Sequence, residues 1–204
     1  LKDQPPRTTL KPGEKLGCGS HGILGGYMEL RHKHVSAMER SKAKFDLIDD
    51  EFNAIFGRAY GGQIEEYRMD DADVVLVGSG SMCGTIKAVI DEKRQAGINV
   101  GLLKMRMYRP FPGEAMVKAL AGKKAIGVVD RSLCFGHEGG PIYTELKAFE
   151  TKLGGSKMIS FIDGVANTDI TKANVGQMID MTCDLAAGRD VREVTWVSYP
   201  DANK

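Results

Sequence analysis

The stretch ADVVLVGSGSMCGTIKAVIDEKRQAGINVGLLKMRMYRPF, residues 72–111, decides the fold of this chain. It opens with an apolar run at residues 74–77 and a glycine-rich turn at residues 78–80. A helical pattern follows over residues 82–95, and a second apolar run covers residues 100–103. A strand, a tight turn, a helix and a strand in this order predict two parallel strands joined by a crossover helix. Because sheets of this kind bind ligands at the carboxyl ends of their strands, the functional site is expected at these ends.

The rest of the sequence continues the alternation of helices and buried strands. The expected elements are a helix over residues 114–120, a strand over 125–129, a helix over 142–153, a strand over 157–162 and a helix from a Thr171 cap to Ala187. Residues 191–196 alternate in polarity, which predicts an edge strand or an arm that wraps a partner. Together these elements predict an α/β fold with a mostly parallel sheet and helices on both faces.

A long helix is predicted ahead of the sheet. Residues 27–56 repeat apolar side chains at helical spacing without a proline, which predicts either one helix or two helices joined near Ser41. Such a helix packs on a neighbouring domain or chain, or it covers the sheet, and the pattern does not separate these alternatives. A short strand is expected over residues 64–69, just before the first buried strand.

The composition divides the chain into four segments. Residues 1–26 are rich in Pro, Gly and Lys, and we expect them to be a linker or an extended edge. Residues 27–71 are expected to form a helical connecting segment, residues 72–190 the α/β domain and residues 191–204 a C-terminal arm. Because the first residue is Leu1 and not Met, we expect the chain to start within a longer protein.

Composition and charge argue against several classes of function. The net charge is +1 and no basic face is visible, which argues against binding to nucleic acid. No apolar run approaches the ~20 residues that span a membrane. No signal peptide is visible either, so a cytoplasmic protein with reduced thiols is expected. The cysteines form no C-x-x-C pair, which argues against a zinc site or an iron–sulfur cluster in this chain. They are Cys18, Cys83, Cys134 and Cys183.

The glycine-rich turn suggests a nucleotide-binding hypothesis. Glycines at Gly78, Gly80 and Gly84 would let the backbone approach a pyrophosphate at the start of a helix. The acidic residue that usually binds a ribose hydroxyl is missing after the next strand. Lys104 and Arg106 stand there instead, and they suit the 2′-phosphate of NADP. The alternative is that the glycines only form a tight turn between a strand and a helix.

Few other side chains suggest chemistry. Cys134 and His137 lie in a second glycine-rich loop, but no third group is at hand to orient a nucleophilic pair, so we interpret them as loop side chains. Arg109 and Arg131 follow strand ends, where they would hold an anion or a partner's carboxylate, or pair locally; an interface role is favoured. Asp49, which has acidic neighbours, is interpreted as part of a solvated turn of helix.

Four blocks of the sequence together resemble the alpha subunit of the thiamine-dependent 2-oxoacid:ferredoxin oxidoreductases, in particular pyruvate:ferredoxin oxidoreductase (pyruvate synthase). The blocks are EEYRMDDAD (residues 65–73), GSGS (78–81), GINVGLLKMRMYRPFP (97–112) and VDRSLCFGHEGGP (129–141). The resemblance covers nearly the whole chain. It implies the second domain of that subunit, which is similar to the C-terminal domain of transketolase.

The resemblance also implies a place in a larger enzyme that converts a 2-oxoacid (pyruvate), CoA and oxidised ferredoxin to acyl-CoA, CO2 and reduced ferredoxin. It implies that thiamine diphosphate, Mg²⁺, [4Fe–4S] clusters and CoA bind to other parts of that enzyme, with no cofactor and no catalytic residue in this chain. The implied partners are beta, gamma and ferredoxin-like delta subunits or domains, with ferredoxin as the electron acceptor. This chain alone is expected to be inactive and to supply scaffold and subunit contacts. The candidate interface residues are Arg109, Pro110, Phe111, Pro112, Arg131 and Gly136.

Two alternatives to this hypothesis stay open. The first is a free-standing NADP-type nucleotide-binding module that uses the turn from Gly78 to Gly84. The second is an interaction domain without an enzyme partner.

Overall fold

The computed structural model describes residues 11–13 and 26–203. The chain divides into two units, residues 1–37 and residues 38–204. The first unit contains the beginning of helix α1 (Tyr27–Phe56), and the second contains the rest of that helix and the whole sheet. Most of the linker predicted over residues 1–26, including Cys18, lies outside the described residues.

A six-stranded sheet forms the second unit, with the strand order β1-β3-β2-β4-β5-β6. The short edge strand β1 runs antiparallel to β3, and every other neighbouring pair is parallel. The predicted α/β fold with a mostly parallel sheet is therefore confirmed. Because β1 and β6 also belong to the sheet, it extends beyond residues 72–190. The strands are β1 (Ile64–Tyr67), β2 (Val74–Ser79), β3 (Val100–Met105), β4 (Ala125–Asp130), β5 (Lys157–Ile162) and β6 (Val194–Trp196).

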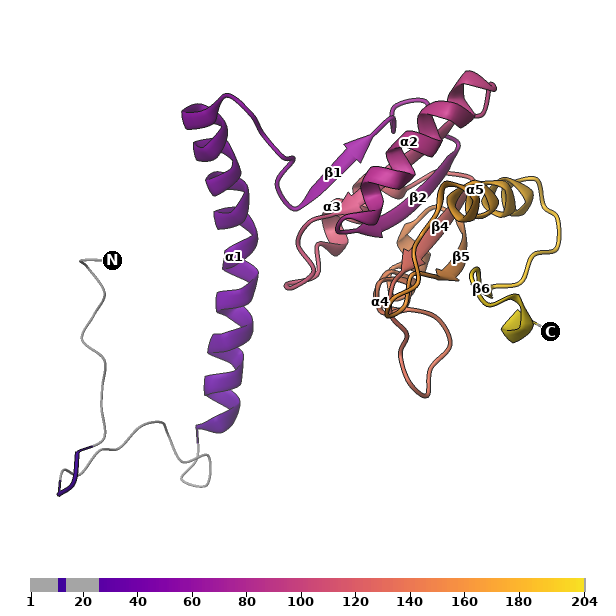
Figure 1. Ribbon diagram of the computed structural model, residues 1–204. Helices are drawn as coiled ribbons and strands as arrows, with labels where there is room; N and C mark the ends of the chain where they lie inside the picture. Colours follow the sequence, from indigo (N-terminus) through magenta and orange to yellow (C-terminus); the bar gives the residue numbers. More distant parts are fainter. Residues whose placement is uncertain (1–10, 14–25, 204) are drawn as a thin grey trace. The chain divides into compact units, whose positions relative to one another are not determined.

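Helices cover both faces of this sheet, as predicted (Figure 1). Helices α2 (Met82–Gln95) and α5 (Lys172–Ala186) pack against one face, where Val74 and Leu76 of β2 point. Helices α3 (Gly113–Leu120) and α4 (Pro141–Lys147) pack against the other face. Successive side chains of a strand point to opposite faces, so the continuous apolar run of β2 supplies both cores. Thr171 caps α5 as expected, since its hydroxyl accepts a hydrogen bond from the Asn174 N–H at 3.2 Å.

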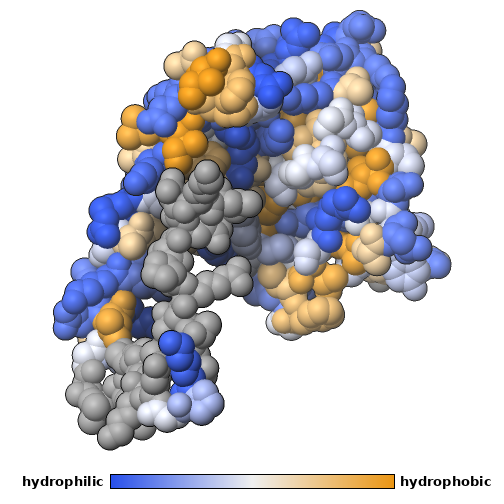
Figure 2. Space-filling model, turned by 60° about the vertical axis from the view of Figure 1, so that its left-hand side comes forward, coloured by the Kyte–Doolittle hydropathy of each residue, from blue (hydrophilic) through white to orange (hydrophobic). Residues whose placement is uncertain are grey.

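Helix α1 is a single helix over the predicted residues, without a joint near Ser41. The Ser41 hydroxyl donates to the Met38 carbonyl at 2.6 Å, so its polar group is satisfied within the helix. No residue of α1 is buried. Hydrophobic residues interrupt the charged surface of this helix in the space-filling view (Figure 2). Those exposed in its second half include Leu47, Ile48, Ile55 and Phe56.

The helix predicted over residues 142–153 is shorter than expected. Helix α4 ends at Lys147, and a short 3-10 helix, η2 (Glu150–Lys152), follows it. Between them the Phe149 backbone leaves the helical region, and its ring stacks on Phe111 with 5.9 Å between the ring centroids. This aromatic contact comes from a residue 38 positions earlier, which the local helical pattern could not reveal.

Candidate functional site

The strand order creates a topological switch point between β2 and β4. From β2 the chain crosses to β3 on one side, and from β3 it returns to β4 on the other side. Loops that follow β2 and β4 therefore diverge at the carboxyl edge, which is where open α/β sheets bind ligands. A groove of about 260 Å³ lies there, and we call it the switch-point groove. It is lined by Ser81, Met82, Thr85, Arg131, Asp169 and Ile170.

The glycines of the first turn have a structural role in this chain. Gly80 adopts a φ of +69°, and a Cβ at Gly78 would lie 3.0 Å from the Met82 side chain. Only glycine fits such positions without strain or displacement of a neighbour. The tight turn between β2 and α2 therefore explains both residues. Gly84, by contrast, faces open space, because no described atom would lie within 4 Å of a Cβ at this position.

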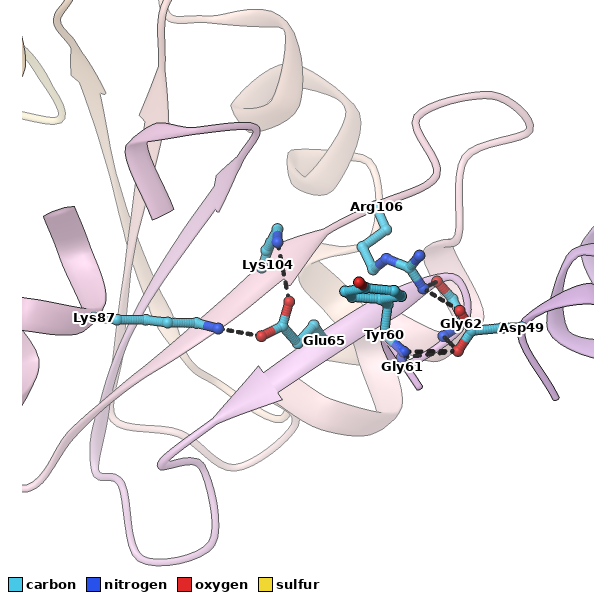
Figure 3. Close-up of polar contacts among 8 residues, drawn as sticks. All are labelled: Asp49, Tyr60, Gly61, Gly62, Glu65, Lys87, Lys104 and Arg106. Atoms are coloured by element: carbon cyan, nitrogen blue, oxygen red, sulfur yellow. Dashed lines mark hydrogen bonds and ion pairs between the residues drawn. The ribbon is translucent and has the colours of Figure 1, made fainter. Parts of the chain in front are cut away.

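The two basic residues predicted to suit a 2′-phosphate are already paired with carboxylates (Figure 3). The Lys104 ammonium lies 3.0 Å from Glu65, which also accepts from Lys87. The Arg106 guanidinium lies 3.1 Å from Asp49. Burial would raise the pKa of Glu65, but hydrogen bonds from the two lysines outweigh it and lower that pKa. Neither cation is left to neutralise an NADP phosphate, which removes the main support for the nucleotide hypothesis.

Asp49 is not part of a solvated turn, contrary to the sequence interpretation. One of its oxygens accepts the backbone N–H groups of Tyr60, Gly61 and Gly62 at 3.0–3.1 Å, and Arg106 donates to the other (Figure 3). Arg106 also donates to the Gly62 carbonyl at 2.8 Å. We call these residues the Asp49 cluster. It joins the second half of α1 to the turn before β1 and to the end of β3.

The electrostatics of the Asp49 cluster favour the charged carboxylate. The Asp49 side chain is 11% exposed, and this burial would by itself raise its pKa. The N–H groups of Gly62 and Tyr60 and the Arg106 guanidinium act in the opposite direction and lower the pKa below its ordinary value. The Asp49 cluster therefore connects these segments through an ionised carboxylate. Because its pKa is lowered, this carboxylate is unsuited to accept a proton near neutral pH.

The predicted interface segment divides into exposed and buried residues. Arg109 is exposed, forms an ion pair with Glu145, and lies 4.2 Å from the centroid of the exposed Tyr108 ring. Pro110 and Pro112 are buried, and Phe111 is half-buried against Phe149. The segment therefore presents Arg109 and Tyr108 to the solvent, whereas its two prolines shape the loop from inside.

The second glycine-rich loop follows β4 and carries Arg131, Gly136 and a prominent aromatic residue. Gly136 is exposed with a φ of +77°. Beside it, Phe135 is 93% exposed, and the sequence motifs did not single it out. The His137 Nδ1 lies 2.6 Å from the Glu138 carbonyl, and no hydrogen bond in the described part of the chain joins this ring to the Cys134 thiol. The structure thus gives no support to a nucleophilic pair there.

Asp130 closes the base of this loop as a buried carboxyl group at the end of β4. Its two oxygens accept the backbone N–H groups of Ile142 and Tyr143, at 3.0 and 3.1 Å, at the start of α4. Burial raises the pKa of Asp130 to about 6, although the two N–H groups oppose this rise. A Cβ at Gly140 would lie 2.2 Å from the Asp130 side chain, so the loop requires glycine at this position.

The described residues hold neither a metal-binding cluster nor a membrane-spanning helix. Across residues 11–13 and 26–203, no three or more His, Cys, Asp or Glu side chains are placed to hold a metal ion. None of the helices described there is both long and apolar enough to cross a membrane.

Comparison with known proteins places the chain in a family. It is 36% identical over all 204 residues to pyruvate synthase subunit PorA of Methanothermobacter thermautotrophicus, of which it covers 51%. It is also 36% identical, over 89% of its length, to ketoisovalerate oxidoreductase subunit VorA of Pyrococcus abyssi, of which it covers 46%. The chain thus spans about half the length of these relatives.

A 2-oxoglutarate:ferredoxin oxidoreductase from Magnetococcus marinus matches 66% of this chain and 21% of its own, with a TM-score of 0.43 and 14% identity. The model of one protein family, pyruvate:ferredoxin oxidoreductase core domain II, matches residues 72–175. These residues make up half of the chain and contain its glycine-rich turn, the Arg109 segment and the Arg131 loop. The chain therefore belongs to the pyruvate:ferredoxin oxidoreductase core domain II family, as its sequence motifs predicted.

Proposed function

We propose that this chain is the second domain of the alpha subunit of a 2-oxoacid:ferredoxin oxidoreductase. The enzyme would convert a 2-oxoacid, CoA and oxidised ferredoxin to an acyl-CoA, CO2 and reduced ferredoxin. The observation that carries the proposal is the family match over residues 72–175, supported by the PorA relative aligned along the whole chain. Pyruvate is the proposed substrate because several of the relatives are named pyruvate synthase subunits.

Within that enzyme, the domain would supply contacts and scaffold and no catalytic group. In support, three cations near the carboxyl edge are paired locally: Lys104 with Glu65, Arg106 with Asp49 and Arg109 with Glu145. Each of these cations thus has a carboxylate partner within the domain. Exposed aromatic side chains, Tyr108 and Phe135, lie on the two loops beside them, and aromatic residues of this kind anchor protein interfaces.

The cofactors of the proposed reaction would lie in other parts of the enzyme. These are thiamine diphosphate with Mg²⁺, the [4Fe–4S] clusters and the CoA site. The proposed partners are beta, gamma and ferredoxin-like delta subunits or domains, with ferredoxin as the acceptor, in the cytoplasm.

The test is affinity purification of the tagged chain from its source cells, followed by mass spectrometry and an activity assay. We expect subunits that carry thiamine diphosphate and iron–sulfur clusters to co-purify, and the complex to reduce ferredoxin when pyruvate and CoA are both present. Parallel assays with 2-oxoisovalerate and 2-oxoglutarate determine the substrate class. A chain recovered without such subunits, or a complex inactive with every 2-oxoacid, would overturn the proposal.

A further inference from the structure

We propose that the switch-point groove binds a small phosphate ester that also carries a hydroxyl group. This inference is independent of the proposed function, because it concerns only the described residues that line the groove. The start of α2 and two loops that are distant from it in sequence meet there. Ser81 and Thr85 follow β2, Arg131 follows β4, and Asp169 follows β5.

Arg131 is the first element of the proposed site. Its Nε–H donates to the Gly164 carbonyl at 2.9 Å, which fixes the base of the guanidinium. In the described part of the chain, Arg131 has no carboxylate partner, whereas three other arginines, Arg94, Arg106 and Arg109, each have one. The terminal nitrogens of a guanidinium form a planar fork that matches the oxygens of a phosphoryl group. A positioned but unpaired arginine in a groove is therefore suited to receive an oxyanion.

Two hydroxyl groups complete the polar lining around Arg131. Ser81 is exposed and Thr85 is half-buried, and both line the groove. Neither hydroxyl forms a hydrogen bond within the described residues, so both are free to donate to a ligand. One guanidinium and two hydroxyls can serve three phosphoryl oxygens, whereas a carboxylate offers only two. The lining therefore favours a phosphoryl group over a carboxylate.

Asp169 determines what the rest of the ligand must be. It lines the same groove and forms no ion pair with Arg131 in the described structure. An ionised carboxylate only accepts hydrogen bonds, so it would repel a bare phosphate and attract a ligand hydroxyl. The groove, at about 260 Å³, also has room for a small organic molecule beyond the anion. These features together favour a hydroxylated phosphate ester over inorganic phosphate.

The test is NMR titration of the ¹⁵N-labelled chain, in phosphate-free buffer, with glycerol 3-phosphate, inorganic phosphate and glycerol. We expect glycerol 3-phosphate to shift the signals of Ser81, Thr85 and the Arg131 side-chain N–H, with a tighter dissociation constant than inorganic phosphate. Glycerol alone should shift none of them. An absence of shifts at these residues with both anions, or equal affinity for the two, would overturn the proposal.

Variants separate a specific site from general attraction by positive charge. R131Q should weaken binding of glycerol 3-phosphate by about tenfold, because it removes a charge-assisted pair of hydrogen bonds. R40Q is the matched control. Arg40 is exposed on α1 and has no carboxylate partner in the described structure, so its replacement removes the same positive charge at a position outside the groove. D169N should abolish the preference for glycerol 3-phosphate over inorganic phosphate. Equal losses in R131Q and R40Q, or an unchanged preference in D169N, would contradict the inference. Unchanged thermal unfolding shows that each variant is folded.

Discussion

Asp130 and Asp49 both accept backbone hydrogen bonds, yet their contributions to the stability of the fold change with pH in opposite directions. Burial raises the pKa of Asp130 to about 6, so the folded chain binds this proton more tightly than the unfolded chain does. Its contribution to stability is full below about pH 4 and is lost as the pH rises through 6. Asp49 has a lowered pKa despite its burial, so its contribution is present above about pH 4 and is lost in acid.

The first prediction concerns D130N. Between pH 4 and pH 7, Asp130 should lower the free energy of unfolding by about 2–3 kcal/mol, and this pH-dependent loss should vanish in the variant. Urea unfolding of both proteins at several pH values measures it. D190N is the control, because the Asp190 side chain is exposed and forms no hydrogen bond or ion pair in the described structure. The same pH slope in D130N and in the unmodified chain would contradict the assignment.

The second prediction concerns D49N. An amide at this position would place an NH2 group against three backbone N–H donors or against Arg106, so the melting temperature at pH 7 should fall. D50N, one residue away on the exposed side of α1, should have little effect. The difference in melting temperature between D49N and D50N should become smaller in acid, where the Asp49 carboxylate of the unmodified chain itself becomes protonated. Identical melting temperatures at pH 7 would show that the Asp49 cluster contributes nothing.

At the scale of elements, a methyl group added at two glycines, Gly140 and Gly176, should change the stability of the fold in opposite directions. Gly140 precedes α4 beneath the Asp130 side chain, whereas Gly176 lies inside α5 with only the tip of Lys93 near its position. G140A should destabilise the fold by about 3 kcal/mol, since a Cβ would lie 2.2 Å from Asp130. G176A should stabilise it by about 0.5–1 kcal/mol through helix propensity. Denaturant unfolding measures the change in the free energy of unfolding for both variants. A G140A variant as stable as the unmodified chain would contradict the described contact between Gly140 and Asp130.

The elements that the sequence predicted well are those determined by local pattern. Helix α2 between β2 and β3, the Thr171 cap and the bounds of α1 all follow from periodicity, glycine stops and capping residues close in sequence, whereas the pattern left open whether α1 is one helix or two. The early end of α4 was missed; there the Phe149 ring stacks on the distant Phe111, a contact that the local pattern does not contain. Pattern can indicate the type of an element, but its length also depends on contacts that only the fold supplies.

The site residues also divide into those that local sequence predicts and those that only contacts distant in sequence determine. Arg131 could be predicted, because it stands directly after a buried strand, where α/β sheets bind ligands. Asp49 could not, because its partners are the backbone of residues 60–62 and Arg106, 57 positions away. Asp169 carries no sequence signal either, and only the meeting of the start of α2 with two distant loops brings it to the groove. Phe135 had a usable signal, since a large aromatic side chain beside a glycine in a loop is a candidate for exposure.

At the scale of the whole molecule, the proposal is that the carboxyl-edge loops bind other parts of an oxidoreductase. Arg109 with Tyr108 on one loop, and Phe135 on the next, would be the contact residues. Truncating such anchors weakens an interface by roughly 2–4 kcal/mol, which is a factor of about thirty to about a thousand in dissociation constant. The chemical step would be unaffected once the subunits are saturated.

Reconstitution of the enzyme from purified subunits, with F135A or R109A in this chain, separates assembly from chemistry. R189A is the matched control, because Arg189 is another exposed arginine paired with a local carboxylate, Asp184, after the end of α5. The measurement is ferredoxin reduction as a function of the concentration of this chain. The proposal predicts that F135A and R109A need at least roughly tenfold more chain for half-maximal activity, with kcat unchanged at saturation and R189A normal. A collapse of kcat in fully assembled enzyme, or wild-type titration curves for both variants, would contradict it.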